Sequence, residues 1–411
     1  MNTERSVSHS PRVSFPWLST ALIELESSGL KRTRRRVTPH ADGTCEIDGH
    51  LLKNYASNDY LGLAHDPRVI RSARTAMENA GAGGRASALI CGRTDWHVLL
   101  EEKLQEFKQA EAAILFPTGY AANLGVISAL TNENDLILSD ELNHASLIDG
   151  CRLSRAEISV YPHNDMETLK ARLANAAGYR QRMVVTDGLF SMDGDVAPLN
   201  EICDLCDQYD ASVIVDEAHA TGVLGLHGRG SAEWMEVEKR VDVRIGTLSK
   251  AIGSQGGFVT GSQDLVEWLW NKARTQIFST SLTPAACAAA MTAIEIIQNE
   301  PQRREQLLAS SHRFRKKLRS YGIQYCQHAI GPIIPIILND PFKAVEIAHQ
   351  LEHYGFLVGA IRPPSVPEGT SRLRIALSFM HPDKMNDQLA DLLAELINKR
   401  KPLKSTPEKP R

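Results

Sequence analysis

Short apolar runs that each end in polar or small residues constrain the fold of this chain most. The runs are DLILSD (135–140), RMVVTDG (182–188), ASVIVDEAH (211–219) and VDVRIGTLSK (241–250), and helix-like segments such as 198–209 lie between some of them. Runs rich in Val, Ile and Leu that alternate with helical patterns are typical of buried parallel strands joined by helical crossovers. The sequence therefore predicts an α/β fold with a mainly parallel sheet in a large domain.

The polar residues that follow these runs are candidates for a functional site. In open parallel sheets ligands bind beyond the carboxyl ends of the strands, because those ends meet at one edge. We therefore expect the following residues to converge: Asp140, His144, Asp187, Asp216, His219, Thr247 and Lys250.

The chain is too long for one compact core, which predicts more than one domain. Residues 1–57 are expected to form an N-terminal arm, 58–300 a large domain, and 301–398 a smaller C-terminal α+β domain that reads as helix, short strands, then helix. A helical pattern at 284–300 joins the two domains. The charged, proline-bearing residues 399–411 are expected to be a disordered tail.

Composition excludes some classes of protein. A formal charge of −3 over 411 residues provides no basic excess for nucleic acid. No apolar run is long enough to cross a membrane, and seven scattered cysteines suit a reducing cytoplasm. Cys203 and Cys206 form a CxxC, but no second pair follows at zinc spacing, so we expect helix packing and no metal site.

Lys250 lies in GTLSKAIGSQGG (246–257), where it is either a surface charge or a nucleophile that needs space around it. Asp216 ends a buried run, and a buried carboxylate needs a cationic partner. That partner is either a structural arginine or a protonated heterocycle. A Schiff-base lysine must be partly desolvated, and the surrounding glycines would let a flat cofactor approach the backbone.

Thr118, Gly119 and Tyr120 begin a helical pattern in FPTGYAANLGVISAL (116–130), where free backbone N–H groups favour a phosphate. A glycine before a helix is also an ordinary entry turn. His144 and His219 are each compatible with a structural or a catalytic role. Their position beside an aspartate and a lysine at strand ends favours catalysis.

Together these segments resemble a known family. DELNHAS, TDGLFSMDGD, VDEAHATGVLGLHGRG, GTLSKAIGSQGG and IRPPSVPEGTSRLRIAL, in this order, are similar to the α-oxoamine synthases. These are pyridoxal 5'-phosphate (PLP) enzymes of fold type I, the aspartate-aminotransferase fold. The similarity covers about residues 15–398. It implies homodimers with the active site at the subunit interface, and condensation of an amino acid with an acyl thioester with loss of carbon dioxide.

The resemblance implies a role for each matched residue. Lys250 would bind the cofactor covalently, Asp216 would keep its pyridine nitrogen protonated, His219 would bond its phenolic oxygen, and His144 would stack on the ring. The cofactor and its phosphate would also be held by Gly119, Tyr120, Ser191, Thr247 and, from the partner subunit, Thr280. The substrate would be bound by Arg32, Asn58, Ser365 and Arg374.

The loop AIRPPSVPEGTSRLR (360–374) is most similar to members that join L-alanine to a pimeloyl thioester, carried on coenzyme A or on acyl carrier protein. Glycine-using members typically lack the Ile-Arg-Pro-Pro opening, and they remain the first alternative. A non-enzymatic protein that holds PLP or binds nucleic acid is a more distant one.

Two segments allow more than one interpretation of their contacts with substrate. The basic cluster KRTRRR (31–36) is either a solvated charge run or a contact for the phosphates or carboxylate of the thioester; Arg32 is the residue that the resemblance matches, and Arg34 is its alternative. Ala88 stands where many family members have an arginine, and Arg85 lies close to it in the chain.

Overall fold

A seven-stranded sheet forms the centre of the computed structural model, which describes residues 15–398. Its strands lie in the order β4-β10-β9-β8-β7-β5-β6. They are β4 (Ala112–Phe116), β5 (Leu136–Asp140), β6 (Glu157–Tyr161), β7 (Arg182–Asp187), β8 (Ser212–Asp216), β9 (Val243–Thr247) and β10 (Gly257–Gly261). The strands predicted from the apolar runs are β5, β7, β8 and β9, and they pair in parallel. Only β10 runs antiparallel to its neighbours, so the prediction of a mainly parallel sheet is confirmed.

Both faces of this sheet are covered at its central strands, which explains why β5, β7 and β8 are mainly apolar; the edge strand β6 is mostly exposed. Successive side chains of a strand point to opposite faces. In β8, Val213 and Val215 pack into one apolar cluster, whereas Ile214 packs into the cluster on the other face. A strand with one solvated face would instead alternate apolar and polar residues.

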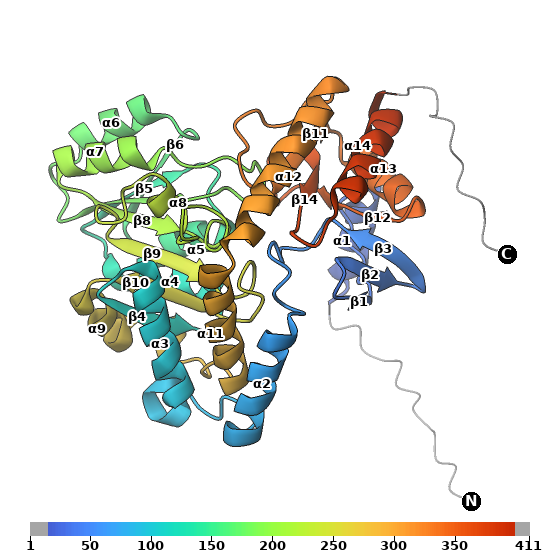
Figure 1. The fold of residues 1–411 in the computed structure, drawn as a ribbon. Helices are drawn as coiled ribbons and strands as arrows, with labels where there is room; N and C mark the ends of the chain where they lie inside the picture. Colours follow the sequence, from blue (N-terminus) through green and yellow to red (C-terminus); the bar gives the residue numbers. More distant parts are fainter. Residues whose placement is uncertain (1–14, 399–411) are drawn as a thin grey trace, which may run out of the picture.

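Helices lie around the sheet (Figure 1). They are α2 (Pro67–Ala80), α3 (Asp95–Lys108), α4 (Gly119–Leu130), α5 (Ala145–Leu153), α6 (Met166–Ala174), α7 (Leu199–Tyr209), α8 (Ser231–Trp234), α9 (Gln263–Lys272), α10 (Arg274–Ile277) and α11 (Pro284–Asn299), with a π-helical turn at Ala88–Gly92. The predicted helix packing of the CxxC segment is confirmed, because Cys203 and Cys206 of α7 are buried in the core. Burial raises the pKa of the Cys203 thiol to about 11.

The C-terminal part lies on the other side of the molecule in Figure 1. It comprises α12 (Pro301–Ser320), β11 (Ile333–Asn339), α13 (Pro341–His353), β12 (Phe356–Leu357), β13 (Gly359–Ile361), β14 (Ser371–Ala376) and α14 (Asp383–Asn398). The prediction of helix, short strands and helix was wrong about the middle of this segment. Asp340 caps α13 and Pro341 occupies its first turn, so a helix separates β11 from the later strands.

The N-terminal residues join the C-terminal part through a sheet. They form α1 (Trp17–Ser27), β1 (Val37–Pro39), β2 (Thr44–Ile47) and β3 (His50–Asn54), and β3 pairs in parallel with β12. The proposed division at residues 57 and 300 remains a prediction. The predicted tail, 399–411, lies outside the described residues. Across residues 15–398, no helix has the length and apolar character needed to cross a bilayer.

Candidate active site

Asp216 ends β8 and is buried, with 4% of its surface exposed. One carboxylate oxygen accepts a hydrogen bond from Asn123 Nδ2 at 2.6 Å, and the other accepts from the Ala218 amide at 2.8 Å. Asn123 was missed in the sequence, although a polar residue in the apolar pattern of α4 was the available signal. Within residues 15–398, no arginine forms a hydrogen bond or ion pair with Asp216, which removes the structural arginine considered above.

Lys250 follows the end of β9 and lies half-buried at the same edge of the sheet. Burial lowers the pKa of its amine to about 8, although the nearby carboxylates of Asp216 and Asp187 favour the ammonium form. The Arg374 guanidinium lowers this pKa further. A lysine with this pKa has a usable fraction of neutral amine near neutral pH, as a nucleophile or a base requires.

His144 follows β5 and caps α5. Its backbone amide donates to Asp187 Oδ2 at 2.6 Å, and its Nδ1 lies 2.7 Å from Ser146 Oγ. Partial burial lowers the pKa of the His144 imidazole, while the Asp216 carboxylate opposes that shift. Asp187 lies beside Asp216 in the strand register, and burial next to that carboxylate raises the pKa of Asp187 well above its usual value. His144 is therefore held between two strand ends.

Arg374 of β14 brings the C-terminal part into the site. Its Nε donates to the Ser191 carbonyl at 2.6 Å, and its Nη2 donates to Asn58 Oδ1 at 3.1 Å and to Tyr60 Oη at 3.2 Å. Tyr60 is fully buried, and its hydroxyl lies 2.7 Å from His219 Nδ1. Burial lowers the pKa of His219 well below its usual value, and the charges of Lys250 and Arg374 act in the same direction.

These contacts unite Asn58, Ser191, His219 and Arg374, which were predicted separately. Tyr60 links them and was not predicted. Its hydroxyl contacts a residue 314 positions away in the chain, and no local pattern marks such a pairing.

The first turn of α4 lies against the ends of β9 and β10. A Cβ on Gly257 would lie 2.4 Å from the Thr118 carbonyl oxygen, and a Cβ on Gly119 would lie 3.3 Å from the Thr247 Cβ. Thr118 caps the helix by accepting a hydrogen bond from the Ala121 amide at 3.0 Å. The amides of Gly119 and Tyr120 have no partner within the helix, since they belong to its first turn. This place suits an anion.

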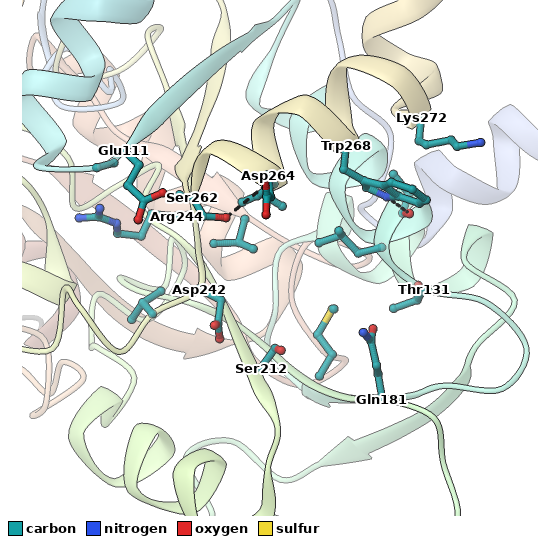
Figure 2. Close-up of a pocket in the computed structure, with 18 of the residues that line it drawn as sticks. Glu111, Thr131, Gln181, Ser212, Asp242, Arg244, Ser262, Asp264, Trp268 and Lys272 are labelled. Carbon is teal, nitrogen blue, oxygen red and sulfur yellow. Dashed lines mark hydrogen bonds between the residues drawn. The ribbon is translucent and has the colours of Figure 1, made fainter.

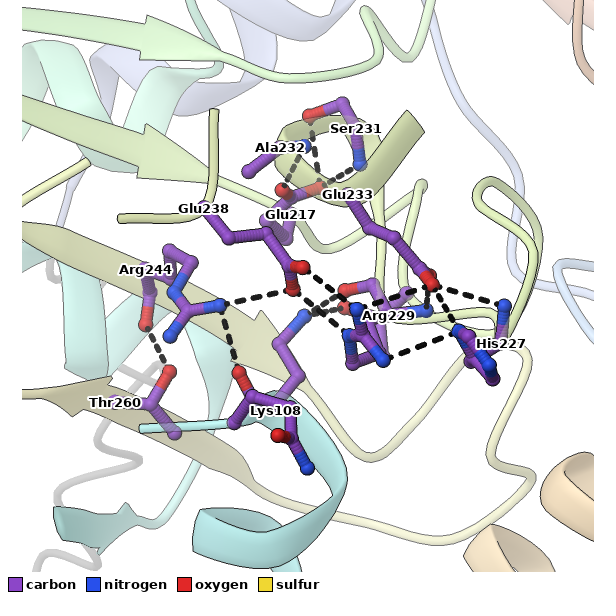
Figure 3. A network of polar contacts seen from close by, with 12 residues as sticks. Lys108, Glu217, His227, Arg229, Ser231, Ala232, Glu233, Glu238, Arg244 and Thr260 are labelled. Atoms are coloured by element: carbon purple, nitrogen blue, oxygen red, sulfur yellow. Dashed lines mark hydrogen bonds and ion pairs between the residues drawn. The ribbon is translucent and has the colours of Figure 1, made fainter. Parts of the chain in front are cut away.

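A buried polar network holds the loop that follows Asp216 (Figure 3). The Glu217 carboxylate accepts hydrogen bonds from the Ser231 amide at 2.8 Å and the Ala232 amide at 2.9 Å. The Lys108 ammonium is fully buried and donates to Thr221 Oγ1 at 3.1 Å. Burial lowers the pKa of Lys108 to about 8. The network fixes the loop that carries His219.

Three predicted residues stand apart from this group on the single chain, and all three are exposed: Arg32, Thr280 and Ser365. Arg32 donates to the Pro363 carbonyl at 3.3 Å, which places it at the turn that contains Ser365. Thr280 forms an isolated bridge with Ser87, and its contact with a partner subunit stays a prediction. Tyr120 is 43% exposed, and its hydroxyl donates to Asp149.

The basic cluster and the glycine-rich loop make contacts of their own. Arg35 forms an ion pair with Glu352, which neutralises part of the cluster 31–36 within the chain. Arg85 donates to the Ala80 carbonyl at 2.6 Å and so binds the end of α2. Ala88 begins the π-helical turn.

A groove of about 1050 Å³ lies at the opposite, amino ends of the strands (Figure 2). Ser212, Asp242, Arg244 and Trp268 are among its lining residues, and none of the predicted site residues contributes to it. Within the described residues, no group of three or more His, Cys, Asp or Glu side chains could hold a metal ion. The chemistry-bearing side chains therefore gather at the carboxyl edge and not at this groove.

Comparison with known proteins identifies the class. Residues 53–393 match the family model of aminotransferase class I and II. The chain therefore belongs to the aminotransferase class I and II family.

Individual relatives have names more specific than that of the family. The chain is 45% identical over 386 residues to 8-amino-7-oxononanoate synthase of Anaeromyxobacter sp. (strain K), covering 94% of this chain and 96% of the relative. It is 45% identical over 366 residues to 8-amino-7-oxononanoate synthase 2 of Bacillus subtilis (strain 168), covering 89% and 93%. Its fold is similar to that of serine palmitoyltransferase from S. paucimobilis with bound PLP and myriocin, with a TM-score of 0.89 at 30% identity over 95% of this chain and 99% of that one.

Proposed function

We propose that the chain catalyses the reaction of an 8-amino-7-oxononanoate synthase, the decarboxylative condensation of L-alanine with a pimeloyl thioester, with PLP as cofactor. The observation that carries the proposal is the 45% identity, over nine-tenths of the chain, to relatives of that name. The residues of the candidate site support it, because most of the set that the α-oxoamine synthase resemblance requires lies at one sheet edge, with Arg32, Thr280 and Ser365 apart from it.

The residues at this edge fit PLP. Lys250 supplies an amine with a lowered pKa, and Asp216 supplies a buried carboxylate whose hydrogen-bond donors are a side-chain amide and a backbone amide. The first turn of α4 and the Thr247 hydroxyl lie together where a phosphate would sit. The cofactor would be held by Gly119, Tyr120, His144, Ser191, Asp216, His219, Thr247, Lys250 and the partner's Thr280. When bound, PLP supplies an electron sink that stabilises negative charge at the substrate Cα.

The protein's own residues orient and deprotonate alanine. Arg374, held rigid by its bonds to Ser191, Asn58 and Tyr60, would bind the alanine carboxylate together with Asn58. The Lys250 amine, with a pKa of about 8, is suited to take the Cα proton and to return it later. Arg32 and Ser365, which lie at the same turn, would contact the acyl substrate from the edge of the site.

We further propose that the chain acts in the cytoplasm as a homodimer with its site at the subunit interface. All seven cysteines are free, which suits a reducing compartment. In α1, Trp17 is 64% exposed and Ile23 is 66% exposed, and a second copy would cover such an apolar surface. The division into an arm, a large domain (58–300) and a small domain (301–398) belongs to the same proposal.

A product assay tests the proposed function. Alanine, glycine and serine are each paired with pimeloyl, acetyl and palmitoyl thioesters, on coenzyme A and on acyl carrier protein. Alanine with the pimeloyl thioester should give the fastest release of thiol and carbon dioxide. A clear preference for glycine, or for serine with the palmitoyl thioester, would replace the proposal with another α-oxoamine synthase activity.

A further inference from the structure

Four buried or site-facing polar groups form a continuous chain behind the candidate site. Asn123 Nδ2 lies 2.6 Å from Asp216 Oδ2 and 2.8 Å from Ser146 Oγ. Ser146 Oγ in turn lies 2.7 Å from His144 Nδ1. Asn123 is 1% exposed and Ser146 is fully buried, so water does not compete for these bonds. The chain links the carboxylate at the end of β8 to the imidazole at the start of α5.

The direction of each hydrogen bond follows from the carboxylate. An ionised carboxylate only accepts hydrogen bonds, so the Asn123 group that faces Asp216 must be the NH₂. The reverse orientation would press the amide oxygen against the carboxylate. In the observed orientation Asn123 Oδ1 is buried without a hydrogen-bond partner among the described residues. The free-energy cost of this unpaired oxygen is smaller than that of placing it against the Asp216 carboxylate. The second N–H of the same group donates to Ser146 Oγ.

The tautomer of His144 follows in the same way. Because Ser146 Oγ accepts from Asn123, its hydroxyl hydrogen is available to donate to His144 Nδ1. The Ser146 backbone amide also points at His144 Nδ1, at 3.2 Å, and an amide can only donate. Two donors at one nitrogen make Nδ1 the acceptor, so the proton of the neutral ring must lie on Nε2.

We propose that Asn123 and Ser146 are positioning residues that fix His144 as its Nε2–H tautomer. His144 is exposed and lies within electrostatic reach of Asp216 and Lys250, while its Nδ1 is bonded to Ser146, so the Nε2–H group is the one available to a bound molecule. His144 then acts toward the substrate as a hydrogen-bond donor and not as an acceptor. The catalytic consequence of this tautomer rests on the proposed function, whereas the tautomer itself does not.

Nitrogen-15 NMR of histidine-labelled protein, recorded without added cofactor, tests the tautomer. The His144 signals are assigned by their loss in His144→Gln. The wild-type ring should show the Nε2–H pattern. Ser146→Ala removes the hydroxyl donor but keeps the backbone amide, so the share of the Nδ1–H form should rise without the Nε2–H form being lost. Ser128→Ala is the matched control, because it deletes a hydroxyl from α4 that, among residues 15–398, bonds only the carbonyls of Leu124 and Gly125.

Turnover gives the second readout. Ser146→Ala and Asn123→Ala should lower kcat about tenfold, as expected for the loss of one positioning hydrogen bond, while Ser128→Ala stays at the wild-type rate. An Nδ1–H ring in the wild-type protein would refute the proposal even if the variants fail to fold. An unchanged tautomer in a folded Ser146→Ala would show that the backbone amide alone fixes the ring, and would refute the role proposed for the Ser146 and Asn123 side chains. If the tautomer is as proposed but alanine and pimeloyl thioester give no product, the proposed function fails and the positioning role stands.

Discussion

The amine of Lys250 should react at a pH where an ordinary lysine is almost wholly protonated. Its pKa of about 8, in place of 10.5, results chiefly from burial. At about pH 7 this leaves roughly one amine in ten neutral, against about one in three thousand for an ordinary lysine. Capture of PLP by Lys250 should therefore be about three hundred times faster at this pH than capture by an unperturbed lysine.

The assay measures covalent capture of PLP. Protein freed of cofactor is mixed with PLP at a series of pH values from about 6 to about 10, trapped with borohydride, and the labelled peptide is located by mass spectrometry. The initial rate at Lys250 should reach half its maximum near pH 8. Lys250→Arg keeps the positive charge and should show no label at this position. A half-maximum near pH 10.5 would refute the argument that burial controls this amine.

Two variants should move the profile in opposite directions. Asp216→Asn removes a carboxylate that favours the ammonium form of Lys250, so the half-maximum should fall below pH 8. Arg374→Gln removes a cation that disfavours the ammonium form, so the half-maximum should rise. Shifts in the same direction would show that general loosening of the site, and not these charges, sets the pKa of Lys250.

Three further outcomes are expected. Asp216→Ala should abolish product formation, since the cofactor nitrogen would lose its carboxylate; a rate near wild type in the thiol-release assay would contradict this role. Tyr60→Phe should lower kcat/KM about tenfold with an unchanged circular dichroism spectrum, because its hydroxyl bonds His219 and Arg374. The double variant Cys203→Ala/Cys206→Ala should keep its kcat, and a zinc chelator should not affect the parent protein; inhibition by the chelator would revive a metal role for the pair.

Burial on both faces explains why four strands could be predicted from the sequence. β5, β7, β8 and β9 are buried on both faces, so each reads as a continuous apolar run and is visible without its neighbours. β4 is equally buried but was not predicted as a strand, and the direction of β10 depends on its pairing with β4 and β9. Local pattern identifies a buried strand, whereas direction and order are properties of the assembled sheet.

Local sequence pattern likewise predicted only part of the candidate site. His144, Asp216 and Lys250 follow strands, so the rule that parallel strands end at one edge was enough to group them. Asn123 lies inside a helix, and Glu217 faces away into a buried network. The polar Asn123 in the apolar pattern of α4 signalled that this residue has a buried partner, but no local pattern identifies the partners of Asn123 or Glu217, which lie in other elements.

Among residues 15–398, the Asp216 carboxylate has no charged hydrogen-bond partner. The sequence left two cations open for this carboxylate, an arginine or a protonated heterocycle. In the structure its hydrogen-bond donors are the Asn123 amide and the Ala218 backbone, and neither carries a charge. The Asp216 carboxylate favours the ammonium form of nearby Lys250, but burial lowers the pKa of that amine and so favours its neutral form. A buried carboxylate with neutral donors still favours a cation beside it, because desolvation removes the screening that water would provide. The protonated pyridine nitrogen of PLP would be a cation of the right kind, and the proposed role of Asp216 is to stabilise that proton.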